Sequence, residues 1–188
     1  TAQTALASFI YVNNETGSIN NIKELASVAH KHGVMFHVDA TQAAGKIPIN
    51  VEELGVDFLS ASAHKLYGPK GIGCAYIKVD KYGLPPLSAL IHGGEQESGI
   101  RAGTLAVHNI VGFGKAAEIA LRDLNDTHKR ISELDQYLIE KIQGNDDLRV
   151  VIPDKYRAKG IISILVEKSE FNNERFVKRI SDELAIST

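Results

Sequence analysis

The sequence predicts an α/β fold with a mainly parallel sheet and crossover helices, followed by part of a small C-terminal α/β domain. Short apolar runs rich in β-branched residues alternate with helical and turn-forming stretches through the first part of the chain. This alternation is typical of right-handed βαβ units. From about residue 126 the rhythm changes to two further strands and a helix. We therefore expect two units, residues 1–125 and residues 126–188.

The first elements form the start of a βαβ unit. An apolar run over residues 5–12 predicts a strand, and Asn13–Gly17 is a cluster of turn-forming residues. Residues 20–31 carry apolar side chains on one face, which predicts an amphipathic helix, and Gly33 ends it.

Three further strands are predicted around the residues of interest. Residues 34–38 are apolar and short, which predicts a buried parallel strand that ends at Asp39. A loop with a short helix leads to a strand over 56–60. The glycine-rich turn 68–73 then leads into a strand over 74–79. This turn lacks the lysine–serine/threonine ending of a nucleotide P-loop, so we expect it to redirect the chain.

The remaining sequence predicts helices and then a small α/β unit. Residues 107–143 have a helical pattern that is too long for one globular helix, so Asn125–Thr127 is predicted to break it and to cap a second helix. Strands are predicted over 148–152 and 160–166, and a helix from about Asn172.

Composition favours a globular protein that acts on small molecules. The 188 residues are 44% hydrophobic and 23% charged, which is enough to bury a core. The net charge is -2 without a long run of one sign, so we expect neither nucleic-acid nor membrane binding. No apolar run reaches bilayer length, and a single cysteine excludes an intrachain disulfide. A cytoplasmic location, or a comparable reducing organelle matrix, fits best.

Asp39 and Lys65 are the first candidates for chemistry. Each follows the carboxyl end of a predicted strand, and ligands of parallel α/β sheets bind outside these ends. We therefore expect them to face one crevice. Taken alone, a carboxylate and a lysine there would also fit a structural ion pair.

The neighbouring side chains match the needs of pyridoxal 5'-phosphate. This cofactor needs a lysine amine, a carboxylate for its pyridine nitrogen and short donors for its phosphate. Lys65 and Asp39 supply the first two. Gln42 follows Asp39 closely enough to reach the ring hydroxyl, and Ser62 with His64 would meet the phosphate oxygens.

Four ordered motifs resemble those of the cysteine desulfurases, which belong to the class V aminotransferase group of fold-type I pyridoxal-phosphate enzymes. The motifs are VNNETG at 12–17, HVDATQ at 37–42, SAHKLYGPKG at 62–71 and RAGTL at 101–105. Their order and spacing are those of the family, whereas residues 106–188 resemble it only in general pattern. The resemblance implies the incomplete large domain of a fold-type I enzyme.

The resemblance also implies a role for each candidate residue. Lys65 would hold the cofactor as a Schiff base, and Asp39 would pair with the pyridinium nitrogen. Asn14 and Gln42 would contact the ring substituents. The residues implied at the phosphate are Ser62, His64 and, for the phosphate of the partner subunit, Thr104. The intact enzyme is therefore expected to be a homodimer with shared sites.

The implied activity is removal of sulfur from L-cysteine, which gives L-alanine and a protein persulfide. Lys65 would move the α-proton. A sulfur-acceptor or scaffold protein would then receive the sulfur for iron–sulfur clusters or thiolated molecules. Selenocysteine lyases and other class V aminotransferases share these motifs and stay open as alternatives. A non-enzymatic interaction module is an alternative of another class.

Several parts of the family machinery have no counterpart in these motifs. A histidine that stacks on the cofactor and a phosphate-loop threonine normally precede the matched region, and the chain begins at Thr1 without a methionine. The persulfide cysteine and a substrate-binding arginine normally follow segments like 182–188. We therefore expect a fragment of a longer protein that does not release alanine from cysteine by itself.

Cys74 and the histidines have simpler explanations. Cys74 lies in an apolar strand, where we expect an inert core side chain. His30 and His32 point to different faces of a helix and are expected at the surface rather than on a metal. His37 lies inside a strand and is expected to be a hydrogen-bonded core histidine.

Overall fold

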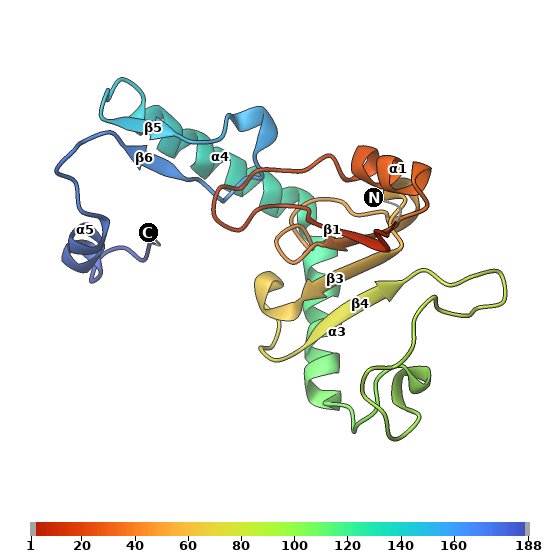
Figure 1. The fold of residues 1–188 in the computed structure, drawn as a ribbon. Coiled ribbons are helices and arrows are strands. Elements are labelled where there is room, and N and C mark those ends of the chain that lie inside the picture. Colours follow the sequence, from red (N-terminus) through yellow and green to blue (C-terminus); the bar gives the residue numbers. More distant parts are fainter. Residues whose placement is uncertain (1–2, 187–188) are drawn as a thin grey trace.

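A four-stranded sheet forms the centre of the computed structural model, which describes residues 3–186 (Figure 1). Its strands are β1 (Leu6–Ile10), β2 (Met35–Asp39), β3 (Phe58–Ser62) and β4 (Gly73–Ile77), in the order β1-β2-β3-β4. β1, β2 and β3 are parallel, whereas β4 runs antiparallel to β3. The predicted α/β fold with a mainly parallel sheet is confirmed.

Two helices make the crossovers between the parallel strands. α1 (Ile22–Lys31) joins β1 to β2, and the side chain of its N-cap residue, Asn21, accepts the Glu24 N–H. α2 (Val51–Leu54) lies between β2 and β3 and is capped in the same way by Asn50. Capping by asparagine satisfies N–H groups that have no partner within the helix, so both helices begin at defined positions.

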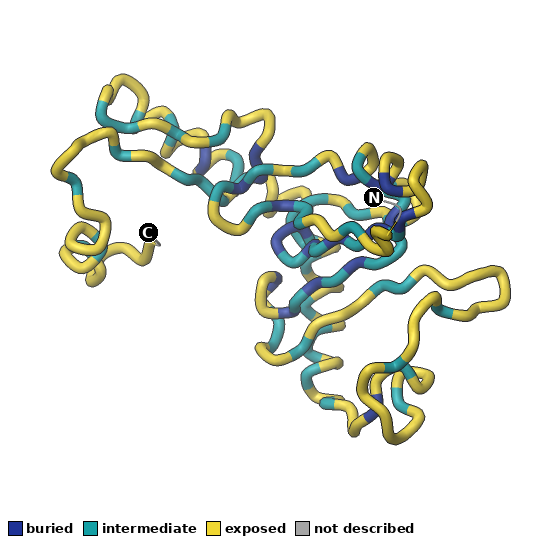
Figure 2. The backbone as a smooth tube through the Cα atoms, viewed as in Figure 1, coloured by how far each residue is buried: buried dark blue, intermediate teal, exposed yellow. Residues whose placement is uncertain are grey.

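The hydrophobic core lies between α1 and one face of the sheet. Ile22 of α1, with Phe36 and Val38 of β2, is at most 1% exposed. Phe36 also stacks on Phe9 of β1, with ring centroids 5.7 Å apart. Every second residue of β2 and of β3 is buried, because strand side chains alternate between the two faces. Figure 2 shows the buried residues concentrated in this part of the chain.

The boundaries of β3 differ from the prediction. The sequence predicts a strand over 56–60, but β3 covers Phe58–Ser62, because antiparallel pairing with β4 continues it to the Ser62–Gly73 pair. Asp39 is itself the last residue of β2. Lys65 does not follow a strand directly, since it lies in the 3-10 turn η1 (Ala63–Leu66).

A bent pair of helices, α3 (Val107–Arg122) and α4 (Leu124–Ile142), leads to the C-terminal elements. The predicted break into two helices is confirmed, but it lies at Asp123 and not at Asn125–Thr127. Those residues lie in the first turn of α4, where they are exposed and polar residues are tolerated. The carboxylate of Asp123 accepts hydrogen bonds from Arg122 instead of capping α4.

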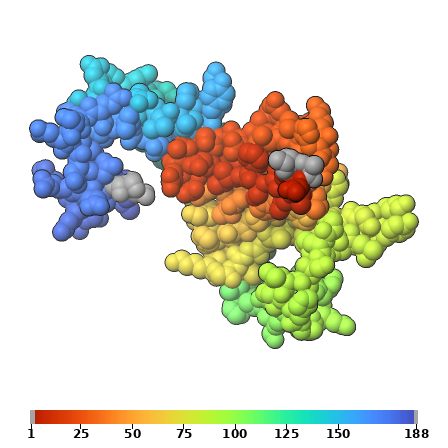
Figure 3. Space-filling model, viewed as in Figure 1, coloured from red at the N-terminus to blue at the C-terminus, as the bar shows by residue number. Residues whose placement is uncertain are grey.

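The C-terminal elements form a small antiparallel pair and a helix. β5 (Leu148–Val150) pairs with β6 (Ile164–Val166), and both are shorter than predicted because only three residue pairs are in register. α5 (Asn173–Ile180) begins after its cap Asn172, as predicted. In Figure 3 these segments (blue) project from the part that contains β1 and α1 (red and orange). Two further 3-10 turns are η2 (Gln96–Gly99) and η3 (Asp154–Tyr156).

Within residues 3–186, none of the helices combines the length and the apolar character that crossing a membrane requires.

Asp57 connects α1, β2 and β4 just before β3 begins. Its Oδ2 accepts hydrogen bonds from His30 Nε2 at 2.8 Å and from the Phe36 N–H at 2.9 Å, and Lys78 Nζ lies 3.7 Å from Oδ1. Burial alone would raise the pKa of Asp57, but these hydrogen bonds and the charges of His30 and Lys78 outweigh it. The pKa of Asp57 is therefore below its ordinary value.

We expect the stability that Asp57 contributes to be lost in acid. Because its pKa is lower in the folded chain, the contribution is complete above the ordinary aspartate value of about 4 and disappears as the pH falls through the folded value. Urea unfolding of wild type and Asp57→Asn across this pH range checks the prediction. The wild type should be more stable at neutral pH, and a difference that stays constant into acid would contradict the prediction.

Candidate cofactor site

Asp39 and Ser62 are the last residues of two neighbouring parallel strands, β2 and β3, so both lie at the carboxyl ends of the strands. Asp39 is in register with Ser60 of β3, and side chains alternate along a strand, so Ser62 lies on the same face as Ser60 and Asp39. Asp39 and Ser62 are both half-buried. The carboxyl ends of these strands therefore carry a carboxylate and a hydroxyl at the place where parallel α/β sheets bind their ligands.

The backbone after β2 holds one oxygen of the Asp39 carboxylate. Asp39 Oδ1 accepts the N–H of Thr41 at 2.9 Å. This is the local side-chain-to-backbone contact that aspartate makes two residues ahead. This hydrogen bond orients the Asp39 carboxylate at the end of β2 and leaves its Oδ2 to contact a ligand.

Lys65 and His64 lie in η1, immediately after β3. Both side chains are exposed, while Ala63, the first residue of η1, is buried and fixes the turn. The next residue but one, Tyr67, has a φ of 65°, and Gly68 follows it. A Cβ on Gly68 would lie 2.9 Å from the Ala63 side chain, so only glycine allows the chain to pass this closely.

Gln42 is the buried member of the predicted set, with 8% exposure. It lies in the turn after β2, and its Oε1 accepts a hydrogen bond from Lys46 Nζ at 2.7 Å. Sequence reasoning missed Lys46. The signal that would have found it is the spacing of four residues, which brings side chains together in a helical turn.

The positive charge of Lys65 acts on Lys46. Burial lowers the pKa of Lys46, and the positive charge of Lys65 lowers it further. The two turns also touch, because a Cβ on Gly45 would lie 3.2 Å from the Leu66 Cβ. The site region therefore holds a second lysine beside the predicted one.

Asn14 lies in an exposed turn whose shape is set by Asn13. Asn13 Oδ1 accepts two backbone N–H groups of the turn, both at 2.9 Å. Gly17 closes the turn with a φ of 75°, and a Cβ there would lie 2.6 Å from the carbonyl oxygen of Ile161. A larger residue at this position would push the turn away from the C-terminal part of the chain.

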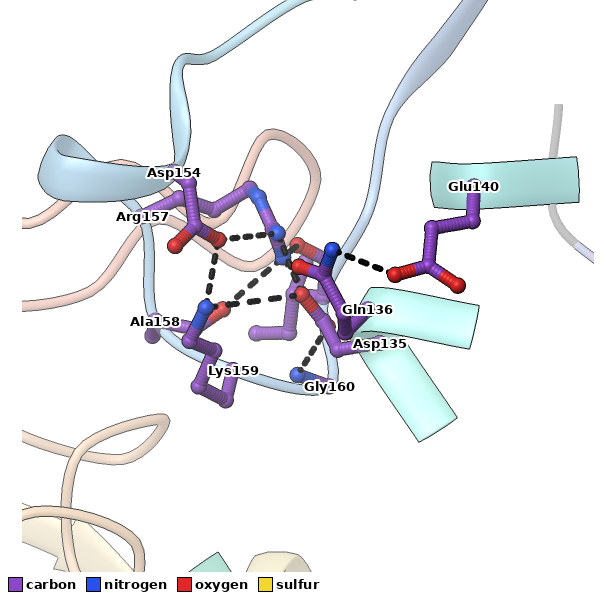
Figure 4. Close-up of polar contacts among 9 residues, drawn as sticks. Asp135, Gln136, Glu140, Asp154, Arg157, Ala158, Lys159 and Gly160 are labelled. Atoms are coloured by element: carbon purple, nitrogen blue, oxygen red, sulfur yellow. Dashed lines mark hydrogen bonds and ion pairs between the residues drawn. The ribbon is translucent and has the colours of Figure 1, made fainter. Parts of the chain in front are cut away.

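A buried ion pair anchors this turn to α4 and to the segment that follows η3 (Figure 4). The side chains of Arg157 and Asp135 are 0% and 1% exposed, and both terminal guanidinium nitrogens donate to the carboxylate. Asp135 Oδ1 also accepts the Gly160 N–H at 2.9 Å. Next to the pair, the Ala158 N–H donates to the Gly17 carbonyl oxygen at 2.8 Å.

Arg157 and Asp135 each stabilise the charged form of the other. Burial alone would raise the pKa of Asp135, but the hydrogen bonds from Arg157 and from the Gly160 N–H make the overall shift downward. The hydrogen bond to Asp135 is the main cause of a raised pKa for Arg157. Both groups are therefore ionised at neutral pH. Sequence reasoning missed this pair, because neither residue belongs to a recognisable motif.

Thr104 is separate from the other predicted residues within one chain. It is exposed on the loop that precedes α3. No interaction described for residues 3–186 joins it to Asn14, Asp39, Gln42 or the Ser62–Lys65 segment. The structure thus brings Asp39, Ser62 and the Gln42 and Lys65 turns to one part of the sheet, and Thr104 is not among them.

His37 lies on the same face of β2 as Asp39, two residues earlier. Its Nδ1 is 2.7 Å from Ser8 Oγ, and its Nε2 is 3.1 Å from Ser60 Oγ. Both ring nitrogens are therefore hydrogen-bonded, as expected, but the side chain is only half-buried, so the predicted place in the core is wrong. In the part of the chain that the structure describes, no group of histidine, cysteine and acidic residues is arranged to hold a metal ion.

Cys74 is exposed, so its predicted place in the core is wrong. The reason is that β4 is the last strand of the sheet in the part of the chain that the structure describes, and consecutive residues at its start are exposed, so neither face is covered there. The surrounding sheet still desolvates the thiol enough to raise its pKa. A thiol with a raised pKa stays protonated at neutral pH and is a poor nucleophile.

Known proteins resemble the chain in sequence along most of its length. Residues 1–187 match the family described as aminotransferase class-V. The cysteine desulfurase IscS of Plasmodium falciparum is 49% identical over 135 residues, which cover 72% of this chain and 24% of that protein. The IscS of Dictyoglomus turgidum is 46% identical over 140 residues, which cover 74% of this chain and 34% of that protein.

Solved structures resemble the chain in fold. A NifS-like protein superposes with a TM-score of 0.85 at 34% identity, covering 95% of this chain and 48% of that one. SspA in complex with cysteine superposes with a TM-score of 0.72 at 33% identity, covering 96% and 48%. The chain thus spans about half of these two solved chains, and about a quarter and a third of the two curated relatives. The family match over nearly the whole chain, together with this fold, shows that the chain belongs to the class-V aminotransferases.

Proposed function

We propose that this chain forms the pyridoxal-phosphate site of a cysteine desulfurase. The family is pyridoxal-phosphate dependent, and the curated relatives described above are cysteine desulfurases. The observation that carries the proposal is the placement of Asp39 and of the Ser62–Lys65 segment at the carboxyl ends of two adjacent parallel strands.

The donors and acceptors present fit the ring of the cofactor. Asp39 has a carboxylate oxygen available for the pyridine nitrogen, because its other oxygen is held by the Thr41 N–H. Gln42 has an amide whose nitrogen can donate to the ring oxygen, and Asn14 would contact a ring substituent from its exposed turn. A carboxylate at the pyridine nitrogen keeps that nitrogen protonated.

The side chains of the η1 region fit the other two parts of the cofactor. The Ser62 hydroxyl and the His64 imidazole would donate to the phosphate. Lys65 would bond covalently to the aldehyde through its amine, and its exposed position in η1 leaves the side chain accessible. Thr104 would reach the phosphate held by a partner subunit, in agreement with its exposure and with the lack of a described interaction between it and the other candidate residues within residues 3–186. This arrangement makes the intact enzyme a homodimer.

The proposed reaction is transfer of sulfur from L-cysteine to a protein thiol. When bound, pyridoxal phosphate withdraws electrons from the carbon that carries the substrate amine. Lys65 would move a proton at that carbon. The sulfur passes to the thiol as a persulfide, and the rest of the substrate leaves as L-alanine. A relative whose solved structure holds cysteine supports this substrate.

We also propose a sulfur acceptor, a domain division and a cellular compartment for the intact protein. A sulfur-acceptor or scaffold protein would take up the persulfide sulfur for iron–sulfur clusters or thiolated molecules. We propose a large domain over residues 1–125 and a small domain over residues 126–188, since the described residues form a four-stranded sheet before this boundary and a separate two-stranded sheet after it. The presence of one cysteine, which is unpaired, agrees with a reducing compartment such as the cytoplasm.

The test is retention of the cofactor by the purified chain. After incubation with pyridoxal phosphate and dialysis, the wild type is expected to keep a visible absorption band that Lys65→Ala abolishes, because no amine remains to hold the aldehyde. Lys70→Ala is the matched control, since it removes an exposed lysine from the neighbouring glycine-rich turn. Borohydride reduction and peptide mass analysis should place the cofactor on Lys65.

Two results would contradict the site. One is a colourless wild-type chain, which would favour the non-enzymatic reading. The other is attachment of the cofactor to a different lysine. The loaded protein also separates the candidate activities, because a desulfurase responds to L-cysteine, a selenocysteine lyase to L-selenocysteine, and an aminotransferase to an amino acid with a keto acid.

A further inference from the structure

The turn after β2 holds a lysine that the proposed function does not use. Lys46 is half-buried, and its Nζ donates to Gln42 Oε1 at 2.7 Å. Gln42 is only 8% exposed, so its amide has little access to water. A buried amide depends on partners within the protein, and Lys46 is the partner of its oxygen.

The chemistry of this hydrogen bond decides which way the Gln42 amide faces. A lysine ammonium has three donors and no acceptor, whereas an amide has an oxygen acceptor and a nitrogen that carries two donors. The amide must therefore turn its oxygen toward Lys46, since the flipped orientation would place donors against donors. Its nitrogen consequently points away from Lys46 with its donors free for an acceptor.

Packing keeps Lys46 beside the proposed cofactor lysine. Gly45 lies between two other elements, because a Cβ there would be 3.1 Å from the Ala120 Cβ of α3 and 3.2 Å from the Leu66 Cβ of η1. Gly45 has a φ of 72°, which glycine adopts without strain. The charge of Lys65 acts on Lys46, in addition to burial, in lowering its pKa. The Gln42–Lys46 pair and the Lys65 turn therefore form one assembly.

We propose that Lys46 is a positioning residue, which holds the Gln42 amide so that its nitrogen donates to the ring oxygen of pyridoxal phosphate. This inference rests on the proposed function. Lys46 acts through Gln42 and does not itself contact the cofactor. The hydrogen bond joins two side chains of the protein and needs no atom of the cofactor, so it can hold the amide in the orientation that binding requires.

A double-mutant cycle on cofactor affinity tests the inference. The Kd for pyridoxal phosphate is measured by absorption titration for wild type, Lys46→Met, Gln42→Ala and the double variant. Each single variant is expected to bind about tenfold more weakly, which is the effect of one hydrogen bond. The double variant should bind no more weakly than Gln42→Ala alone, because Lys46 then has no amide to orient.

Two further variants separate positioning from folding. Gln42→Glu keeps an oxygen for Lys46 but removes the amide donors, so it should keep the melting temperature and lose cofactor affinity. Lys46→Arg should restore most of the affinity, since it still has only donors. Lys31→Met makes the same substitution at the exposed end of α1 and should bind as the wild type does.

The outcomes distinguish this inference from the proposed function. A loss of affinity on Lys46→Met that persists unchanged in the Gln42→Ala background would overturn the positioning role, because Lys46 would then act by another route. Wild-type affinity in Gln42→Glu would overturn it too, even if Lys46→Met failed to fold. A wild-type chain that binds no pyridoxal phosphate would overturn the proposed function itself.

Discussion

Replacing Asp135 with alanine is expected to lower the free energy of unfolding by about 3–5 kcal/mol. The reason is the charge that remains. Arg157 is 0% exposed at its side chain, and without Asp135 its guanidinium would stay buried with no carboxylate at the same depth. Its Nε is buried and has no hydrogen-bond partner among residues 3–186. Urea unfolding followed by circular dichroism measures the loss.

Asp154 provides the matched control for this prediction. Its carboxylate also contacts Arg157, with Oδ1 3.0 Å from Nη2, but its side chain is 54% exposed. Asp154→Ala should therefore cost at most about 1 kcal/mol, as exposed ion pairs do. If Asp135→Ala and Asp154→Ala lowered the free energy of unfolding equally, burial of the ion pair would not determine its contribution to stability. Replacing Asp135 and Arg157 together with leucine and methionine should recover much of the loss, since no charge stays buried.

The second large effect is expected at Phe36, where replacement with alanine should cost about 3–5 kcal/mol. This side chain is 0% exposed and is the largest of those fully buried in the core. The substitution also removes the stacking contact between Phe36 and Phe9. The alanine would leave a cavity between β2 and α1 that the surrounding strands cannot fill by moving. Calorimetric or urea unfolding measures the change.

Phe176 of α5 is the control for the loss at Phe36. It contacts Phe171, with ring centroids 5.2 Å apart, but is 41% exposed. Phe176→Ala should therefore lose less than half as much stability, because less apolar surface leaves the protein interior. A loss as large as that of Phe36→Ala would show that the C-terminal elements contain a core of their own.

Most of the fold could be predicted from the sequence because local patterns agree with the tertiary structure. The apolar residues 34–38 lie almost entirely in β2, and the helical face of residues 20–31 packs on the sheet as α1. The helix predicted from about Asn172 is α5, which begins at Asn173. The ends of β3 were less predictable, because its last pairs depend on the antiparallel partner β4, whose pairing no local pattern specifies.

The candidate site was predictable only where it coincides with motifs. Asp39 and the Ser62–Lys65 segment lie at adjacent strand ends, as their spacing indicates. Lys46 was missed because its spacing of four residues from Gln42 is a signal only if the residues between them form a helical turn, and the sequence predicts a loop with a short helix there. Cys74 was misplaced because an apolar strand at a sheet edge has the same composition as one at its centre.

The contact between Gly17 and Ala158 has a consequence for the order of events during synthesis. The turn that carries Asn14 precedes β2, yet its backbone is held by Ala158, which follows α4 and is therefore translated much later than the turn. Contacts between such distant positions form late, since a long loop must close first. A nascent chain that has left the ribosome only as far as α3 would therefore have its sheet assembled while this loop still samples many shapes. Pulse proteolysis of stalled chains should find cleavage there until the segment after η3 emerges.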